Sequence, residues 1–242
     1  MKLVRYADRP DLREIRFATL SEQTFPEYMH NNEPGNKYWG RLYDEHPDFQ
    51  LALLEGDELV AELHSVPTAW DGSDADRPAG WDEAFTRAFE AGREPDVLCA
   101  LAISIRPDRQ GGRLSSRMLD AMREAAGVHG LRELIAPVRP TWKQRYPLVP
   151  IERYIEWRRD DGSHFDPWIR LHERVGGRIF AAAPESMVME APVADWEEWT
   201  GMAFPEDGDY VFPGALAPLH VRGGIGRHVE PNVWLTHEPL VR

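Results

Sequence analysis

The chain has 242 residues, of which 42% are hydrophobic and 29% are charged. This composition is typical of a folded globular protein and excludes the apolar-poor, highly charged class of disordered chains. The 28 basic and 41 acidic residues give a net charge of −13, which argues against broad binding of nucleic acids or anionic membranes and favours a cationic or neutral partner.

Cysteine usage and the N-terminal segment indicate a cytoplasmic protein. Cys99 is the single cysteine of the sequence, so no intrachain disulfide can form. Residues 1–17 carry charges throughout and lack the apolar run of a signal peptide, and no other stretch reaches 18 uninterrupted apolar residues. We therefore expect a cytoplasmic protein without a membrane-spanning segment, and the sequence predicts no metal site.

The first third of the chain predicts a strand, two helices and a hairpin. Residues 2–6 suit a short strand, and Pro10 opens a helical pattern. An aromatic-rich helix follows around residues 38–43. Apolar segments at 49–54 and 59–66 flank a Glu-Gly-Asp turn and are typical of two strands joined as a hairpin.

The middle of the chain predicts a strand, a glycine-containing turn, a helix and a second strand. The apolar run 97–105 contains β-branched residues and is typical of a central strand buried on both faces. Apolar residues at helical spacing predict a helix over 114–126, which Gly127 and Gly130 can end, and residues 133–138 suit the next strand. Such a unit needs a parallel pair of strands in a sheet.

The last part of the chain predicts a helix, two strands and an irregular tail. Asp166 and Pro167 suit the N-cap and the first turn of a helix, which a pair of glycines ends. Residues 178–183 and 187–191 can then form strands. The segment 192–242 holds aromatic residues among Pro and Gly, which predicts an irregular tail packed through its aromatic side chains.

We therefore expect an α/β fold of two regions, a domain over residues 1–191 and an extension over residues 192–242 packed on it. Two insertions without clean periodicity interrupt the domain, at about residues 71–95 and 140–165. A short helix over residues 81–90 lies within the first insertion.

The turn at residues 109–116 has the features of an anion site. It leads from a strand into a helix, and the start of a helix presents unpaired backbone N–H groups at its positive end. Glycines allow the main chain to approach phosphates closely, and four arginines add positive charge: Arg106, Arg109, Arg113 and Arg117. On spacing alone, an ordinary glycine turn with solvated arginines explains the segment equally well.

The segment 105–119 also resembles the signature of the GNAT superfamily of N-acyltransferases. In that family a strand ends in an aliphatic residue and Pro, followed by Gln/Arg-x-x-Gly-x-Gly/Ala and a helix. With Gln110 in the first position, Ser115 takes the last small position, and Arg113 stands where the family has its first glycine. A register that starts at Arg109 puts Gly112 at the glycine position, but it puts Leu114 at the small position and displaces the aliphatic pair of the helix from its usual place.

The resemblance implies a GNAT-like acyl-CoA N-acyltransferase fold, with a mixed, mostly antiparallel sheet flanked by helices and a splayed central pair of strands. It also implies acetyl-CoA or another acyl-CoA as co-substrate. Main-chain groups over 101–105 would pair with the pantetheine arm and polarise the thioester carbonyl, and residues 110–116 would hold the pyrophosphate. The cofactor-binding residues predicted in this way are Leu101, Ile103, Ile105, Gln110, Gly111, Gly112, Arg113, Leu114, Ser115 and Ser116.

The helix that contains His172 resembles a late GNAT helix that commonly ends in Tyr-x-x-x-Gly-Phe. In many members that tyrosine protonates the departing thiolate of the coenzyme, and His172 takes its position. An imidazole can also donate a proton near neutral pH, so the resemblance makes His172 a candidate catalytic residue. The alternative is a core histidine bonded to the backbone.

The proton acceptor that amine acylation needs is marked less clearly. Some GNAT enzymes use a glutamate of the central strand, but the corresponding position here is Cys99, which is typical of a buried filler. Glu62 and His64 share one face of a predicted strand by their period of two and are the substitute catalytic candidates. The alternative for this pair is a cross-strand surface contact.

We expect an N-acetyltransferase that moves an acyl group directly to an amine in a ternary complex. The acceptor would be a small molecule or a peptide, with no nucleic acid or membrane as partner, and a homodimer is left open. One alternative is a long-chain N-acyltransferase that uses acyl-CoA or an acyl-carrier protein; the other is a non-catalytic acyl-CoA-binding sensor or partner domain. The C-terminal region, with aromatic segments at 165–168, 196–201 and 230–234, resembles that of long actinobacterial GNAT proteins.

Overall fold

The computed structural model describes residues 1–111 and 113–240. Gly112, one of the predicted pyrophosphate-binding residues, lies outside the described residues. The strands are β1 (Lys2–Arg5), β2 (Gln50–Glu55), β3 (Glu58–Thr68), β4 (Val97–Ile105), β5 (Leu134–Val138), β6 (Arg178–Pro192), β7 (Gly208–Tyr210), β8 (Leu219–Arg222) and β9 (Ile225–His237).

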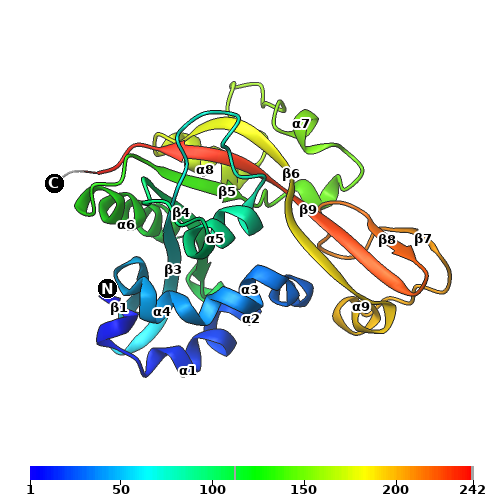
Figure 1. Ribbon diagram of the computed structural model, residues 1–242, viewed down its shortest axis with the longest axis horizontal. Helices are drawn as coiled ribbons and strands as arrows, with labels where there is room; N and C mark the ends of the chain where they lie inside the picture. The colour runs from blue at the N-terminus through cyan, green and yellow to red at the C-terminus, as the bar shows by residue number, and fades with distance from the viewer. Residues whose placement is uncertain (112, 241–242) are drawn as a thin grey trace.

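These strands form one nine-stranded sheet in the order β1-β2-β3-β4-β5-β9-β8-β7, with β6 paired to β9 (Figure 1). Neighbouring strands run antiparallel except β4 and β5, which are parallel. The predicted α/β class with a mixed, mostly antiparallel sheet is therefore confirmed.

The helices follow the predicted order closely in the first two thirds of the chain. Residues 12–24 are helical throughout, with a π-helical turn at Phe17–Ser21 in the middle. The α-helices of the described residues are α1 (Leu12–Arg16), α2 (Glu22–Thr24), α3 (Glu33–Tyr38), α4 (Leu42–Glu45), α5 (Trp81–Glu90), α6 (Leu114–Val128), α7 (Ile151–Tyr154), α8 (Pro167–Arg174) and α9 (Val193–Thr200). None of the helices over residues 1–111 and 113–240 combines the length and apolar character that a membrane crossing requires.

Helix α6 continues past Gly127, which we expected to end it. A Cβ atom at that position would lie 2.5 Å from the carbonyl oxygen of Leu240, so Gly127 allows the C-terminal segment to pack closely on the helix. Gly130, with φ of +69°, adopts the left-handed conformation that ends helices instead. The glycine at 127 therefore serves packing and not termination.

The predicted start of α8 is confirmed in detail. The Asp166 side chain accepts hydrogen bonds from the backbone N–H groups of Trp168 and Ile169, at 2.9 and 3.2 Å. Pro167 occupies the first turn, where its missing N–H costs nothing. This cap fixes where α8 begins and hence which of its side chains face the sheet.

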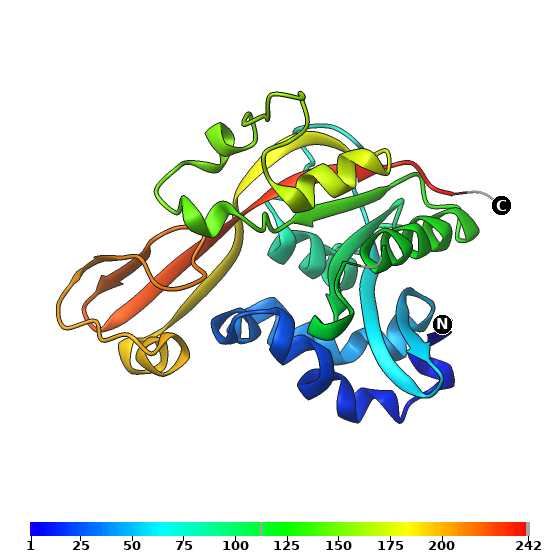
Figure 2. The ribbon, with the colours of Figure 1, turned by 180° about the vertical axis from the view of Figure 1, so that it is seen from behind.

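The prediction of an irregular C-terminal tail is wrong, because the segment 192–242 contributes the long strand β9 to the sheet. Strand β9 pairs with β5 through residues 233–237 and with β6 along nearly its whole length. Strand β6 is itself continuous where we predicted two strands, with a register irregularity between Ala183 and Met187. Pro231 and Gly226 interrupt the apolar pattern of β9, which is why its strand character was not evident from the sequence. Beyond β5 the β6–β9 pair extends as an arm that carries α9, β7 and β8 (Figures 1 and 2).

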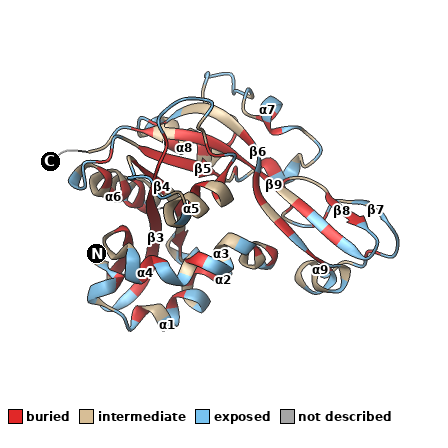
Figure 3. Cartoon of the chain, viewed as in Figure 1, coloured by how far each residue is buried: buried red, intermediate tan, exposed pale blue. Residues whose placement is uncertain are grey.

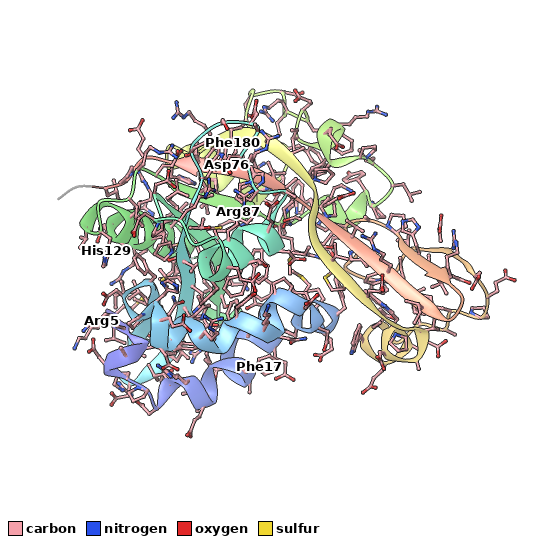
Figure 4. All side chains as sticks on the ribbon, in the orientation of Figure 1. Arg5, Phe17, Asp76, Arg87, His129 and Phe180 are labelled. Carbon is pink, nitrogen blue, oxygen red and sulfur yellow. The ribbon has the colours of Figure 1, made fainter. Side chains whose placement is uncertain are left out.

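The predicted insertion at 71–95 contains α5, and an ion-pair cluster links this helix to the segment before it. The Arg87 guanidinium donates to the backbone oxygen of Asp76 at 2.6 Å, and Arg93 forms a salt bridge with the Asp76 carboxylate at 3.0 Å (Figure 4). Trp81 and Phe85, on the other side of α5, are buried in the core. The insertion thus adds a covering helix to the sheet.

The two faces of the sheet carry different helices, and the side chains of β4 alternate between them. Leu98 packs in a cluster with α6, and we call this side, which α6 and α8 cover, the α6 face. Cys99 and Leu101 pack with α5 and the N-terminal helices, and we call that side the N-terminal face. Buried residues follow the central strands between these two layers (Figure 3).

Candidate active site

The central parallel pair of strands is joined over two residues and then separates. Leu98 of β4 pairs with Leu134 of β5, and Cys99 pairs with Ile135. Beyond these pairs, no strand among the described residues occupies the edge of β4 that faces β5. Half of β4 therefore presents main-chain N–H and C=O groups without a strand partner on that edge, as the predicted splayed pair requires.

A β-bulge lies at the point where the strands separate. On the other edge of β4, Ala100 pairs with Ser65 and Ala102 pairs with His64, so Leu101 is an extra residue in the ladder. Such a bulge bends a strand and frees one residue from regular pairing. The carbonyl oxygen of Leu101 accepts a hydrogen bond from the Trp81 indole at 2.9 Å, which fixes the bulged residue.

A cavity of about 740 Å³ lies at this opening and reaches both faces of the sheet. From the α6 face it is lined by Ser115 and Leu119 of α6 and by residues of α8. From the N-terminal face it is lined by α5 and by the first helical segments, including Phe17 at their outer edge (Figure 4). The strand residues that line it are Ala100, Leu101, Ala102, Ile103 and Ile105 of β4 and Ala136, Pro137 and Val138 of β5. Two reactants can therefore meet in the cavity from opposite sides of the sheet.

Half of the predicted cofactor-binding residues line this cavity. They are Leu101, Ile103, Ile105, Gln110 and Ser115. Gly111, Arg113, Leu114 and Ser116 are described but do not line it, and Leu114 is buried in the core under α6. The main chain of all these residues at the start of α6 still offers the unpaired N–H groups of a helix N-terminus.

Arg113 adopts the backbone conformation that favours glycine. Arg113 immediately precedes α6 and has a φ of +62°. Among the described non-glycine residues it is the only one with a positive φ. A side chain in this left-handed region is strained by roughly 1–2 kcal/mol. Arginine therefore replaces the family's glycine at this position, but the backbone keeps the conformation that a glycine would adopt.

The positive charge predicted around the turn is partly neutralised. Arg106 forms salt bridges with Asp108 and Glu58, and Arg109 forms one with Glu55 at 2.5 Å. These pairs are exposed and therefore contribute little to stability. The main-chain N–H groups at the α6 N-terminus, more than these arginines, give the turn its capacity to bind an anion.

His172 lies on the cavity wall with one ring nitrogen unpartnered. Its Nδ1 lies 2.8 Å from Nε2 of His237, and its ring packs edge-on against Trp168 with 4.6 Å between centroids. No described residue hydrogen-bonds its Nε2. Burial and the neighbouring His237 lower the pKa of His172 well below 6.5, so the ring is neutral at pH 7. When His237 donates to Nδ1, His172 carries its hydrogen on Nε2 and can donate it to a ligand.

Glu62 and His64, the other catalytic candidates, contact each other but do not line the cavity. The Glu62 carboxylate is fully buried and accepts hydrogen bonds from Arg16 at 2.6 and 2.7 Å and from Tyr6 at 2.6 Å. Burial alone would raise the pKa of Glu62, but His64 and the Arg16 guanidinium lower it to about 2. The geometry gives this pair a role in holding Arg16 and offers no support for a direct proton acceptor. Cys99 is fully buried, and burial raises the pKa of its thiol.

Several cavity residues carried no signal in the sequence. Trp81 contacts Leu101 only because an insertion folds back on the sheet. Arg16 and Arg139 also line the cavity, and each is paired with a buried glutamate distant in sequence. Trp168 lies one helical turn before His172, so the helical spacing could have indicated it.

The chain is similar along almost its whole length to a known acetyltransferase. It is 30% identical, over an alignment 266 positions long, to arginine N-acetyltransferase avaD of Aspergillus versicolor, with 96% of this chain and 91% of that protein covered. The chain belongs to the GNAT superfamily. As a GNAT-type enzyme it is an N-acyltransferase, and its co-substrate is acetyl-CoA or another acyl-CoA. No family model matches the chain.

Solved GNAT-like structures share the fold of this enzyme. The loading GNATL domain of CurA from Lyngbya majuscula superposes with a TM-score of 0.62 at 18% identity, over 98% of this chain and 96% of that one. The GphF GNAT-like decarboxylase in complex with isobutyryl-CoA gives a TM-score of 0.62 at 15% identity, over 98% and 99% of the two chains. At these identities the similarity concerns the fold alone, and it confirms the predicted GNAT-like architecture.

Proposed function

We propose that this GNAT enzyme transfers the acetyl group of acetyl-CoA to a small amine, and that the acceptor is arginine or an arginine derivative. The observation that carries the proposal is the 30% identity, over 96% of this chain, to an arginine N-acetyltransferase. The cavity supports it because donor and acceptor can enter from opposite faces of the sheet. Direct transfer in a ternary complex needs such an arrangement.

In this proposal the coenzyme occupies the α6 face of the cavity. The pantetheine arm lies along the unpaired half of β4, where main-chain groups from Leu101 to Ile105 hydrogen-bond its amides. The pyrophosphate meets the N-terminus of α6, where Gln110 and Ser115 line the cavity. The bulge at Leu101 turns main-chain groups toward the thioester carbonyl, where N–H donors stabilise the negative charge of the transition state.

The chemistry then requires one bond to form and one to break. The amine nitrogen attacks the thioester carbonyl carbon, the C–S bond breaks, and the amine loses a proton to water in the open cavity. His172 Nε2 donates a hydrogen bond to the departing sulfur. Because the pKa of His172 is lowered well below 6.5, it acts as a neutral N–H donor and not as an imidazolium acid.

The test is an assay of purified protein with acetyl-CoA and L-arginine, with free thiol as the kinetic readout and product mass as the identity readout. We expect thiol release that depends on the acceptor and a product heavier by one acetyl group. Repeating the assay with long-chain acyl-CoA tests the long-chain alternative. Binding of acetyl-CoA without turnover of any amine would favour the sensor alternative and overturn the proposal.

A pair of variants on α6 tests the position of the coenzyme. Ser115→Tyr fills the cavity wall at the helix N-terminus and should raise the KM for acetyl-CoA at least tenfold. Asp120→Tyr, on the same helix but outside the cavity lining, is the matched control and should leave that KM unchanged. Equal effects of the two variants would contradict the placement.

A further inference from the structure

The cavity wall is basic although the chain is strongly acidic. The chain carries a net charge of −13, yet the described residues that line the cavity include two arginines, Arg16 and Arg139, and neither aspartate nor glutamate. Each arginine is paired with a buried glutamate that does not line the cavity, so the wall offers guanidinium N–H donors, which suit an anionic group. The overall charge, from which we expected a cationic or neutral partner, does not by itself describe the groups that line this site.

Both arginines lie on the N-terminal face, opposite the proposed site of the coenzyme phosphates. Arg16 binds Glu62, which alternates along β3 with Ala61 and Leu63 of the α6-face cluster. Arg139 binds Tyr28, a member of the core cluster on the N-terminal face. The two guanidinium groups therefore border the part of the cavity that remains for the acceptor.

Arg139 has the geometry of a prepared anion anchor. Its Nε donates to the buried Glu230 carboxylate at 2.5 Å, and its Nη2 donates to the carbonyl oxygen of Gly214 at 2.7 Å and to the Tyr28 hydroxyl at 3.1 Å. Glu230 is held in turn by His228, whose Nε2 lies 2.7 Å from it. These contacts fix the plane of the guanidinium group.

Arg139 lines the cavity, and one nitrogen of its guanidinium group, Nη1, is left over from the contacts described above. No described residue hydrogen-bonds Nη1, and the side chain keeps 20% of its surface exposed although its partner Glu230 has none exposed. Arg16 is less accessible, with a side chain 9% exposed and a two-pronged pair with Glu62. Arg139 is therefore the better placed of the two to bind a ligand.

We propose that the acceptor carries a carboxylate beside its reactive amine, and that Nη1 of Arg139 binds this carboxylate. The inference rests on the proposed function and narrows it to amino-acid-like acceptors with a free carboxylate. Arg139 is a specificity-determining residue in this account, because charge-assisted hydrogen bonds from a guanidinium to a carboxylate are strong and directional.

The test compares L-arginine with L-argininamide as acceptors for acetyl-CoA. Loss of a charge-assisted hydrogen bond should lower kcat/KM for the amide by about 10- to 100-fold. Amidation also makes the neighbouring α-amine less basic and so raises its neutral, reactive fraction, which acts in the opposite direction. A preference for arginine therefore reports the carboxylate and not the reactivity of the amine.

The protein side of the test removes Arg139 together with its buried counter-charge. Arg139→Gln combined with Glu230→Gln leaves no unpaired buried carboxylate, and the ratio of kcat/KM for arginine to kcat/KM for argininamide should fall to one or below. The matched control is Arg87→Gln with Glu83→Gln, another arginine–glutamate pair, which lies outside the cavity lining. This control should keep the wild-type ratio. If the first double variant does not fold, Arg139→Lys retains the charge beside Glu230 and should lower the ratio several-fold.

The outcomes separate this inference from the function on which it rests. Equal kcat/KM for the two compounds with the wild type, after each value is divided by the neutral fraction of that compound's amine, would overturn the carboxylate anchor and leave the acetyltransferase intact. A wild-type preference that survives in the folded Arg139 variants would overturn the assignment to Arg139. Failure to acetylate any amine would instead overturn the proposed function itself.

Discussion

Replacing His172 by phenylalanine tests the proposed donor to the leaving sulfur. Phenylalanine keeps a planar ring against Trp168, which packs at 4.6 Å between centroids, but removes both ring nitrogens. Positioned proton donors contribute about 10²- to 10⁴-fold to rates, and we expect the low end, about 10²-fold in kcat, because a thiolate is already a good leaving group. The KM for acetyl-CoA should change little, since the coenzyme keeps its main-chain contacts.

The structural cost of this change is small enough to be separated from the catalytic effect. The variant leaves Nε2 of His237 without its partner at 2.8 Å, a loss of about 1 kcal/mol that additional apolar burial partly offsets. The matched variant is His172→Tyr, which restores an O–H donor at the same position and should retain kcat within about tenfold. Thermal unfolding of both variants checks that they fold.

The pH dependence of kcat tests the same role of His172. Because burial and His237 lower the pKa of His172 well below 6.5, its ring stays neutral across the working range, and kcat should not decline above pH 6.5 through loss of a proton from this residue. Two results would refute the prediction. One is a kcat of His172→Phe equal to that of the wild type; the other is a wild-type kcat that declines above pH 6.5 when that of the phenylalanine variant does not. The second result would mean that a charged imidazolium gives up the proton.

Three further predictions concern the turn, the bulge and acid stability. Arg113→Gly should relieve the left-handed strain of roughly 1–2 kcal/mol, less the roughly 0.5–1 kcal/mol that glycine loses in conformational entropy, and so raise Tm by about 2 °C. Gly111→Ala, at φ of +93°, should lower Tm instead, and the opposite signs are the check. Trp81→Phe removes the indole donor to the Leu101 carbonyl and should cost about 1 kcal/mol in urea unfolding with a larger loss in kcat/KM than in stability, whereas an unchanged kcat/KM would contradict the role of the bulge. Burial lowers the pKa of His237 from 6.5 to about 4. The contribution of the neutral ring to the free energy of unfolding is therefore present above pH 6.5 and is lost as the pH falls toward 4. Relative to His237→Phe, the wild type should lose about 2 kcal/mol more between pH 7 and pH 5, and parallel losses in urea unfolding would contradict this pKa.

Local patterns in the sequence were sufficient to predict the elements at which we propose that the coenzyme binds. The nine-residue apolar run of β4 and the helical spacing of α6 each specify one element without reference to distant residues. The cap at Asp166 follows from one side chain and the two N–H groups that it satisfies. These elements place Leu101, Ile103, Ile105, Gln110 and Ser115 beside one cavity.

The parts that the sequence did not reveal depend on contacts between distant segments. Strand β9 forms because β5 and β6 offer it an edge on each side, and its own Pro231 and Gly226 obscure the pattern. The bulge at Leu101 arises from the register of β3 against β4. The pairing of Arg139 with Glu230 spans 91 residues, so its place on the cavity wall has no local signature.

A crystal structure of the protein with coenzyme A would show whether acyl-CoA lies between the splayed strands with its pyrophosphate at the start of α6. We predict the pantetheine arm between residues 100–105 and 136–138, with the sulfur within about 3.5 Å of His172 Nε2. Density for the coenzyme at another surface, or a pyrophosphate that makes no contact with the α6 N-terminus, would contradict the account.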